Sequence, residues 1–315
     1  MRTGASPSSP RRRSAELPSP RPAERARPSR DPRFLRALRD VDPELSRLLK
    51  KVPLDARPPL APEWMRCEML ERHRLLEEAR ILPGTTVLEV GAGPHALTTV
   101  PLAFAVGPGG RAIVTERARW GRFREIVDAS GLGDRLRPIT CDARRLPLRP
   151  DSVDLTVCVH AVRSLEDEAG MRRVFREMLR VAPRLFVAET LPIARSDAQR
   201  AHLAMYDLRE PVFEATTGRK DDLHYLPLER LERLIEGVGG TIERRGVLEP
   251  DLPHALAYFP LTLVEAIPEA RTRSALRARW RSARRSAARF GTDHPPVGFL
   301  SALRRPPSHI RRAGG

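Results

Sequence analysis

The junction near residue 90 carries the residue types best suited to chemistry. Residues 85–98 read TTVLEVGAGPHALT, so a β-branched apolar run leads through Glu89 to glycines at positions 91 and 93 and then to a helix-favouring stretch. A strand that turns so tightly into a helix places backbone N–H groups and a carboxylate at the carboxyl end of a parallel sheet, where open α/β folds bind cofactors. The sequence therefore predicts a nucleotide-cofactor site in this loop.

Two cofactor classes compete for the loop. Gly91, Gly93 and Ala96 also satisfy the loose G-x-G-x-x-G/A pattern of dinucleotide-binding loops. Glu89 argues against a dinucleotide, because a carboxylate at the strand tip would repel a pyrophosphate but attract the ammonium group of an amino acid. The loop thus favours a ligand with a cationic end.

Two further acids end the next two predicted strands. Glu116 ends the strand 111–116, at the distance along the chain where a carboxylate reaches ribose hydroxyls. Asp142 lies in the Cys-Asp-Ala end of the strand that begins at Leu136, and it can accept a hydrogen bond from an adenine amino group. Either acid alone could simply cap the turn or helix that follows. Three acids at three strand ends form one coherent pocket.

These motifs resemble those of the class I S-adenosylmethionine-dependent methyltransferases. The resemblance rests on the Glu-x-Gly-x-Gly loop at 89–93, on Glu116 and on the Asp-Ala pair at 142–143, and it runs from about residue 63 to 265. It is closest to the branch that includes quinone-biosynthesis and other small-molecule enzymes. The resemblance implies a Rossmann-like, doubly wound α/β sheet of seven strands, mostly parallel with an antiparallel edge strand.

Later segments extend the correspondence. A fourth strand is expected within 150–162, a helix at 171–181, a fifth strand at 184–189, then a helix at 227–238 and a strand at 241–247. A final edge strand is predicted at 254–259, and a largely charged helix at 63–81 should cover the sheet edge or the cofactor mouth.

The resemblance also implies the cofactor, S-adenosyl-L-methionine, and its ligands. Glu89 and the loop would hold the methionine portion, Glu116 the ribose, and Asp142 with Ala143 the adenine. The full implied set is Glu89, Gly91, Ala92, Gly93, Glu116, Asp142, Ala143 and Val159. The family often has a third glycine where this chain has His95, whose side chain would narrow the space beside the methionine portion.

The acceptor is less well defined. Enzymes of this superfamily that methylate exocyclic amino groups of bases typically carry an Asn/Asp-Pro-Pro-Tyr-like or Asn-Leu-Pro-Tyr-like stretch after the fourth strand, whereas this chain has VHAVR at 159–163. Base N-methylation is therefore disfavoured. His160 lies where the acceptor should approach and could remove a proton from a hydroxyl during O-methylation, or it could simply pack beside the cofactor.

The long connection at 191–226 is a candidate for substrate specificity. It contains an amphipathic helix candidate at 197–208 and then a stretch of aromatic and charged residues. It could close over a substrate or be an ordinary surface connection. The candidate polar contacts are Tyr206, Arg219, His224 and Tyr225.

Composition limits the remaining classes. A chain of 315 residues with 41% hydrophobic residues can bury one α/β core. Its three cysteines have no metal-ligand spacing, so no metal site is predicted, and they suit a reducing compartment. No apolar run is long enough to span a membrane and no secretory signal is evident, which predicts a cytoplasmic protein.

The net charge of +16 is unevenly distributed. Residues 1–33 hold nine arginines against three acids, residues 268–315 hold twelve against two, and the middle of the chain is neutral. The sequence therefore predicts a disordered basic tail at 1–33, a helical cover at 34–80, a cofactor-binding methyltransferase domain at 81–267 and an Arg-rich helix and tail at 268–315.

The segment 270–290 has Leu276, Trp280, Ala283 and Ala287 at helical spacing among eight arginines. It could contact RNA or an anionic surface, or it could dock through Trp280 with its arginines in solvent. The expected function is methyl transfer to a small or lipid-like acceptor, at oxygen or carbon. The alternatives are an RNA methyltransferase anchored by this helix, and a non-catalytic binding protein with the same fold.

Overall fold

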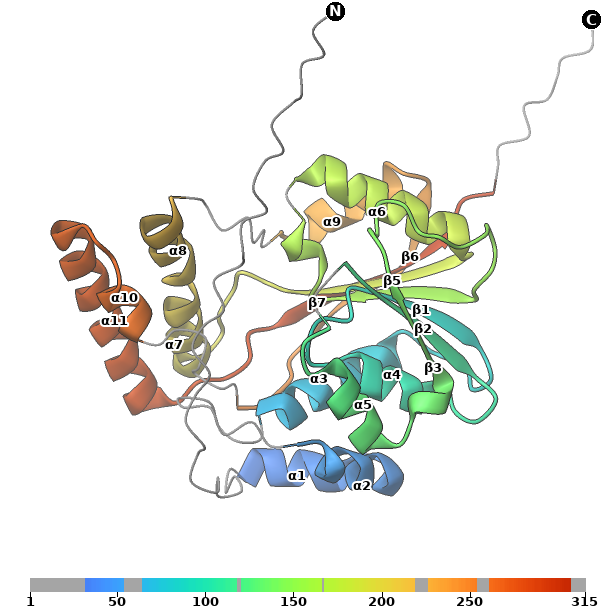
Figure 1. Cartoon of the computed structure of the whole chain (residues 1–315), viewed down its shortest axis with the longest axis horizontal. Helices are drawn as coiled ribbons and strands as arrows, with labels where there is room; N and C mark the ends of the chain where they lie inside the picture. The colour runs from blue at the N-terminus through green and yellow to red at the C-terminus, as the bar shows by residue number, and fades with distance from the viewer. Residues whose placement is uncertain are drawn as a thin grey trace, which may run out of the picture.

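A computed structural model describes residues 32–53, 64–117, 120–165, 167–218, 226–253 and 261–306. Its centre is a seven-stranded sheet with the strand order β3-β2-β1-β4-β5-β7-β6 (Figure 1). The strands are β1 (Thr86–Val90), β2 (Arg111–Glu116), β3 (Leu136–Thr140), β4 (Leu155–Val159), β5 (Arg184–Thr190), β6 (Gly240–Leu248) and β7 (Val297–Arg304).

The pairing of the strands determines where a ligand can bind. β1 pairs in parallel with β2 on one side and with β4 on the other. The chain first extends the sheet outward from β1 through β2 and β3, and it then returns to the other side of β1 with β4. In open α/β sheets ligands bind at such a switch point, outside the carboxyl ends of the strands. β7 runs antiparallel to its neighbours β5 and β6. The mixed seven-stranded sheet is confirmed, and its antiparallel strand lies next to the edge strand β6.

Helices cover both faces of the sheet. On one face lie α3 (Trp64–Glu78), α4 (Thr99–Ala105) and α5 (Phe123–Ser130), and α1 (Pro32–Asp40) and α2 (Pro43–Lys51) pack on the outside of these helices (Figure 1). The other face packs against α6 (Glu168–Val181) and α9 (Leu228–Glu236). Successive strand residues therefore belong to different cores: Val87 of β1 lies in the first and Leu88 in the second. Burial on both sides explains why the parallel strands have continuous apolar runs.

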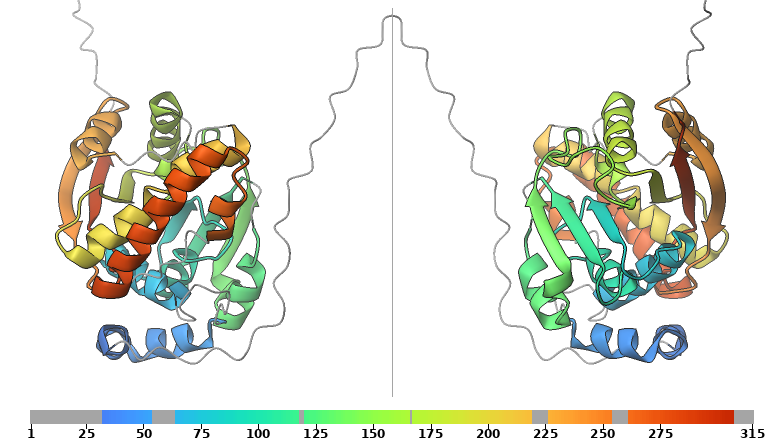
Figure 2. Two further views of the ribbon diagram at one scale, coloured as in Figure 1. Left: turned by 90° about the vertical axis from the view of Figure 1, so that its left-hand side faces the viewer. Right: turned by 90° about the vertical axis from the view of Figure 1, so that its right-hand side faces the viewer.

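A third group of helices lies beside the sheet. It consists of α7 (Asp197–Tyr206), α8 (Arg209–Thr217), α10 (Leu261–Glu265) and α11 (Ala270–Phe290), at the left of Figure 1 and facing the viewer in the left-hand view of Figure 2. These helices share an apolar cluster that includes Met205, Val212, Val264 and Leu276, with Trp280 packed against it. The helix expected at 270–290 is thus docked through Trp280.

One predicted boundary is wrong. The sequence ended the methyltransferase domain at residue 267 and assigned 268–315 to a helix and tail, yet β7 pairs with both β5 and β6 inside the sheet. The sheet therefore extends to Arg304. The apolar run of β7 follows an arginine-rich helix, and that charge hid its strand pattern. The edge strand expected at 254–259 lies outside the described residues, as do residues 1–31 of the predicted tail.

Among the helices of the described ranges, none has both the length and the apolar character needed to cross a bilayer.

Candidate functional site

Two adjoining cavities lie at the carboxyl ends of the parallel strands. The larger has a volume of about 630 Å³ and the smaller about 340 Å³. Gly91, Gly93, His160 and Ser164 line both of them, so His160 stands at their junction. This is the switch point of the sheet, where the sequence placed the cofactor.

The glycine loop is built for close approach. Gly91 and Gly93 have φ angles of 83° and 67°, in the left-handed region that favours glycine. A Cβ on Gly91 would lie 2.5 Å from the Cβ of Ala161, whereas a Cβ on Gly93 would meet nothing within 4 Å. The N–H groups of Gly91 and Ala92 both donate to the carbonyl oxygen of Thr115 at 3.0 Å, which ties the loop to β2. The open space beside Gly93 can therefore admit a ligand.

The larger cavity brings together the acid that ends β2 and the acid that follows β3. Glu116, Asp142 and Ala143 all line it. Glu116 accepts the Gly93 N–H through Oε2 at 3.1 Å. The Arg144 guanidinium binds both oxygens of Asp142, at 2.7 to 3.0 Å, and holds the pKa of that carboxyl below its usual range. Two carboxyl groups beside a glycine loop fit the hydroxyls and amino group of an adenosine.

Glu89 differs from these acids because it lies beneath the loop. Its side chain is 1% exposed and lines neither of the two cavities. The Thr99 hydroxyl donates to Oε2 at 2.6 Å, and Oε1 has no hydrogen-bond partner among the described residues. Burial raises the pKa of Glu89 to about 7. An unsatisfied buried oxygen of this kind calls for a bridging water or another polar partner. The contact of Glu89 with the methionine portion of the cofactor stays a prediction.

The smaller cavity contains most of the remaining candidates. Ala92, Val159 and Tyr206 line it, and so does His95, which is therefore beside the loop rather than behind it. Three substrate candidates lie outside the described residues: Arg219, His224 and Tyr225.

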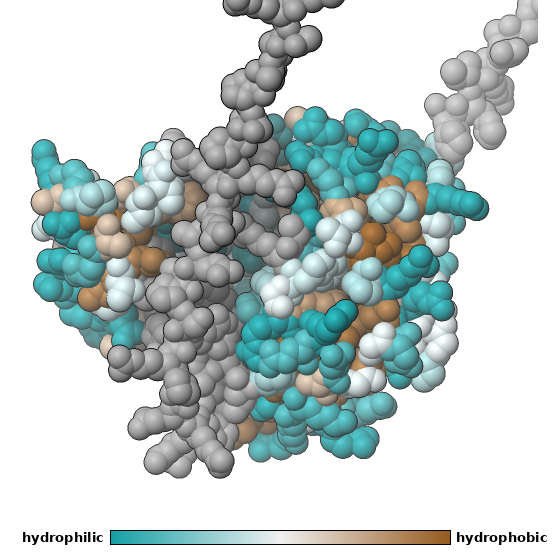
Figure 3. All heavy atoms as spheres, viewed as in Figure 1, coloured by the Kyte–Doolittle hydropathy of each residue, from teal (hydrophilic) through white to brown (hydrophobic). Residues whose placement is uncertain are grey.

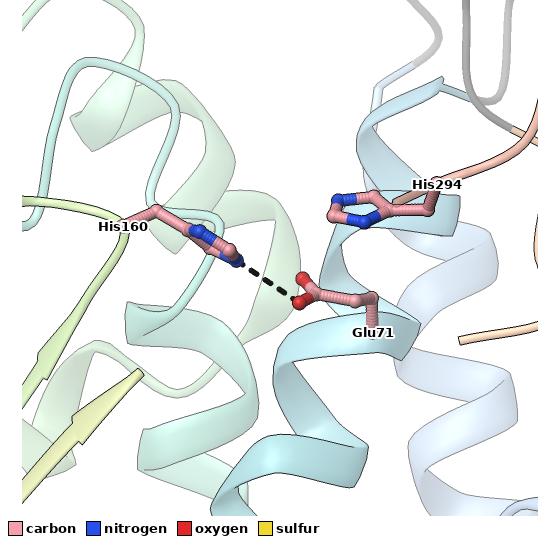
Figure 4. A group of neighbouring side chains, drawn as sticks. All are labelled: Glu71, His160 and His294. Atoms are coloured by element: carbon pink, nitrogen blue, oxygen red, sulfur yellow. Dashed lines mark hydrogen bonds and ion pairs between the residues drawn. The ribbon is translucent and has the colours of Figure 1, made fainter. Parts of the chain in front are cut away.

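The structure adds a buried polar cluster that the sequence analysis missed. His160 has a φ of 54°, a left-handed conformation that is rare for a residue with a side chain, and its Nε2 lies 3.0 Å from Oε1 of Glu71 on α3. Arg72 contacts the carboxylates of both Glu71 and Glu68 at 2.5 Å. His294, which precedes β7, lies against the same carboxylate (Figure 4).

The charge state of this cluster follows from its burial. Burial alone would raise the pKa of Glu71, but Arg72 and His160 outweigh it and lower the pKa to about 2. Burial lowers the pKa of His160 to about 3 despite the neighbouring carboxylate. At neutral pH an ionised Glu71 therefore faces a neutral imidazole.

A weak signal for the cluster was present in the sequence. Glu68, Glu71, Arg72 and Leu75 fall at helical spacings of three and four residues, and all of them are buried. Charged residues that share a helix face with leucines indicate a buried polar interface. The high charge of this helix instead led to the prediction of a cover over the sheet edge or the cofactor mouth.

Comparison with known proteins establishes the fold of this chain and nothing further. No protein-family profile matches the chain, and no curated protein matches its sequence significantly. A solved structure of a cyclopropane-fatty-acyl-phospholipid synthase-like protein from Lactobacillus casei is similar, with a TM-score of 0.65 and 17% identity over 84% of this chain and 100% of that one.

Two weaker likenesses are to S-adenosylmethionine-dependent methyltransferases. The one from Aquifex aeolicus has a TM-score of 0.46 and 16% identity, over 76% of this chain and 92% of that one. The one from Methanosarcina mazei has a TM-score of 0.43 and 14% identity, over 73% and 97%. With the sheet order and the glycine loop, the first likeness shows that this chain has the fold of the class I S-adenosylmethionine-dependent methyltransferases.

Proposed function

We propose that the protein is an S-adenosylmethionine-dependent methyltransferase that acts on a small or lipid-like acceptor, at oxygen or carbon. One observation carries the proposal: Glu116, Asp142 and the glycine loop line one cavity, and a second cavity meets it at His160. The first cavity suits an adenosine, and the second leaves room for an acceptor.

S-adenosylmethionine, when bound, supplies an electrophilic methyl group. The residues of this chain bind the cofactor and orient it toward the acceptor. Glu116 and Asp142 offer carboxylate oxygens to hydroxyl and amino groups, and Gly93 offers open space. His160, which follows β4, lines both cavities, and its ring is held in a fixed orientation by Glu71. Such fixed positioning of two reactants is the main contribution a protein makes to a displacement reaction.

The lining of the smaller cavity favours an acceptor with polar groups. Arg163, His202, Tyr206 and Arg209 present hydrogen-bonding groups, and Leu97 adds an apolar wall. An oxygen acceptor fits this lining better than a carbon acceptor. The name of the Lactobacillus casei protein refers to a fatty-acyl phospholipid, a class that falls within the lipid-like acceptors proposed here.

The test is calorimetric titration of the full-length protein with S-adenosylmethionine, S-adenosylhomocysteine and NADH. We expect micromolar binding of the two adenosyl ligands, weakened more than about tenfold in Glu116→Ala and Asp142→Ala because each loses a charge-assisted hydrogen bond. Asp134→Ala, an exposed acid of the same sheet edge, is the matched control. Binding of NADH instead, or equal affinity in all variants, would overturn the proposal.

A second candidate is RNA methylation, with α11 as the anchor. The specific observation is a row of exposed arginines on this helix: Arg271, Arg279, Arg281, Arg284, Arg285 and Arg289. Hydrophilic side chains gather over this outer part of the helix group at the left of Figure 3. A non-catalytic binding role remains the reading if the adenosyl ligands do not bind. The cytoplasmic location stays a prediction from the sequence.

A further inference from the structure

Three buried side chains from distant parts of the chain converge behind the smaller cavity. Glu71 comes from α3, His160 from the turn after β4, and His294 from the segment before β7 (Figure 4). One ligand atom from each lies within 4.8 Å of the other two, and the residues are 0%, 9% and 6% exposed. Two imidazoles and one carboxylate form a common ligand set for zinc and for other divalent transition metals.

We propose that Glu71, His160 and His294 bind one divalent transition-metal ion, with zinc as the best match to this ligand set. The inference assigns a metal site where the sequence predicted none. Its role rests on the proposed methyl transfer, but the binding itself does not.

Each imidazole has a polar neighbour at Nδ1, the ring nitrogen that would not bind the ion, as metal-binding histidines usually have. Nδ1 of His294 lies 2.9 Å from the carbonyl oxygen of Pro295, which can only accept, so Nδ1 carries the proton and Nε2 carries the lone pair. Nδ1 of His160 lies 3.2 Å from the Thr190 hydroxyl and 3.8 Å from Oε2 of Glu189. The Thr190 hydroxyl can accept a hydrogen bond from Nδ1–H, and in that tautomer Nε2 of His160 carries the lone pair that a metal would bind.

The carboxylate of Glu71 is also held in a fixed orientation. Arg72 holds Oε2 of Glu71, so Oε1 is the oxygen that points toward His160. Arg72 contacts Glu68 as well, and its single guanidinium therefore faces two buried carboxylates. Such buried carboxylates would stabilise a bound dication.

The three ligand atoms lie near the separations that one bound ion requires. Tetrahedral zinc with bonds of about 2.0 to 2.2 Å separates its ligand atoms by about 3.3 Å. His160 Nε2 and Glu71 Oε1 are already 3.0 Å apart. The ligand atom of His294 lies within 4.8 Å of these two atoms. His160 and His294 also line the smaller cavity, so a fourth position faces the space proposed for the acceptor.

That fourth position points to a hydroxyl-bearing acceptor. A metal-bound hydroxyl loses its proton more readily, and the proton leaves to solvent through the cavity. The acceptor oxygen then forms a bond to the methyl carbon while the carbon–sulfur bond breaks, and S-adenosylhomocysteine leaves. The metal selects O-methylation over C-methylation because it binds oxygen.

The experiment uses full-length protein that has been stripped with a chelator and dialysed. Calorimetry with Zn²⁺ and absorption spectroscopy with Co²⁺ measure stoichiometry, affinity and coordination. We expect about one ion per chain and the visible bands of low-symmetry, four-coordinate cobalt. Glu71→Gln and His294→Asn should each weaken binding more than about tenfold. His73→Asn, on the same helix as Glu71 but outside the cluster, should bind as the wild type does.

The outcomes separate the two proposals, because S-adenosylhomocysteine binding is measured on the same samples. Metal binding that is absent, or that survives both cluster substitutions, overturns the metal site whether or not the adenosyl ligand binds. Metal binding without adenosyl binding keeps the site and rejects the methyltransferase. If one variant fails to fold by circular dichroism, the other variant and the cobalt spectrum of the wild type decide.

Discussion

A buried carboxyl at the tip of β1 couples the stability of the protein to pH. Glu89 lies under the glycine loop, where one oxygen accepts the Thr99 hydroxyl and the other has no partner among the described residues. Burial disfavours the charged form and raises the pKa to about 7 from the ordinary 4.5. The folded protein therefore holds a proton that the unfolded chain releases between these values.

The sign of the effect is determined by proton uptake. A carboxyl with a raised pKa makes the folded state bind more protons, so stability falls as pH rises from about 4.5 through 7. Glu89→Gln removes the titrating carboxyl and with it this loss of stability. We expect the variant to unfold with a free energy roughly 3 kcal/mol above that of the wild type near pH 8 and nearly equal to it near pH 4. Urea unfolding at both pH values measures the difference, and the exposed Glu210→Gln is the control. A difference that does not change with pH contradicts the argument.

At the level of elements, the carboxyl end of α3 depends on arginines from the sheet. The helix has no basic residue in its last turn. Arg244 of β6 donates to the carbonyl oxygen of Glu78 at 2.8 Å, and Arg184 of β5 donates to that of Ala79 at 3.2 Å. These bonds satisfy carbonyl groups that a helix end leaves without partners. The same helix carries Glu71, so the arginines help to position it against His160.

Substitution of Arg244 tests this anchoring. Arg244→Met removes the bond to the backbone of Glu78 and the pairing with its carboxylate, and we expect a loss of about 2 kcal/mol in the free energy of unfolding. Arg245→Met is a matched control, because its ion pairs with Glu229 and Glu232 are surface pairs. It should cost less than about 1 kcal/mol. Equal losses would mean that the helix end is not held by Arg244.

The glycine loop makes a second prediction for an element. Gly91→Ala combines a φ of 83° with a Cβ only 2.5 Å from that of Ala161, so we expect a loss of about 3 kcal/mol. Gly93→Ala has the backbone strain without the clash and should cost about 1 kcal/mol. Thermal unfolding compares the two variants. Adding Ala161→Gly to Gly91→Ala should recover the steric part only, and a failure to recover any stability would contradict the clash.

The sequence could predict the elements whose signals are local. The β-branched run before Gly91 and the strand that ends at Glu116 were placed correctly, and both acids of the larger cavity lie at the ends that were predicted for them. The Glu71–His160–His294 cluster had only the weak signal of charged residues on the buried face of α3, because Glu71 and His160 are 89 residues apart and His294 is farther still. Only the crossing of α3 over the strand ends, and the late return of the chain into β7, bring them together.

For the whole molecule, β7 makes the C-terminal region part of the core. Leu300 and Ala302 are buried in the same cluster as residues of α6 and α9. A chain that ends at residue 267 loses this strand and leaves β5 and β6 without their common partner. We expect it to lack a cooperative unfolding transition, whereas a chain that ends at Pro306 should melt as the full-length protein does. Circular dichroism melts compare them, and a folded chain ending at 267 would show that β7 is dispensable.

The distribution of charge bears on the alternative that α11 binds RNA. A truncation before α11 cannot test this alternative, because it would also remove β7, which follows α11 in the chain. The exposed arginines of α11 lie on a helix group beside the sheet (Figure 1). If this helix binds RNA, the triple substitution Arg279→Gln, Arg281→Gln and Arg285→Gln should weaken binding of a single-stranded oligoribonucleotide. It should also reduce the slope of log affinity against log salt by up to about 2, since each phosphate contact releases counterions. Fluorescence anisotropy over a salt series measures both, with S-adenosylhomocysteine affinity as the control for the fold. An unchanged slope removes α11 as the anchor and leaves the small acceptor as the substrate class that the polar cavity beside His160 supports.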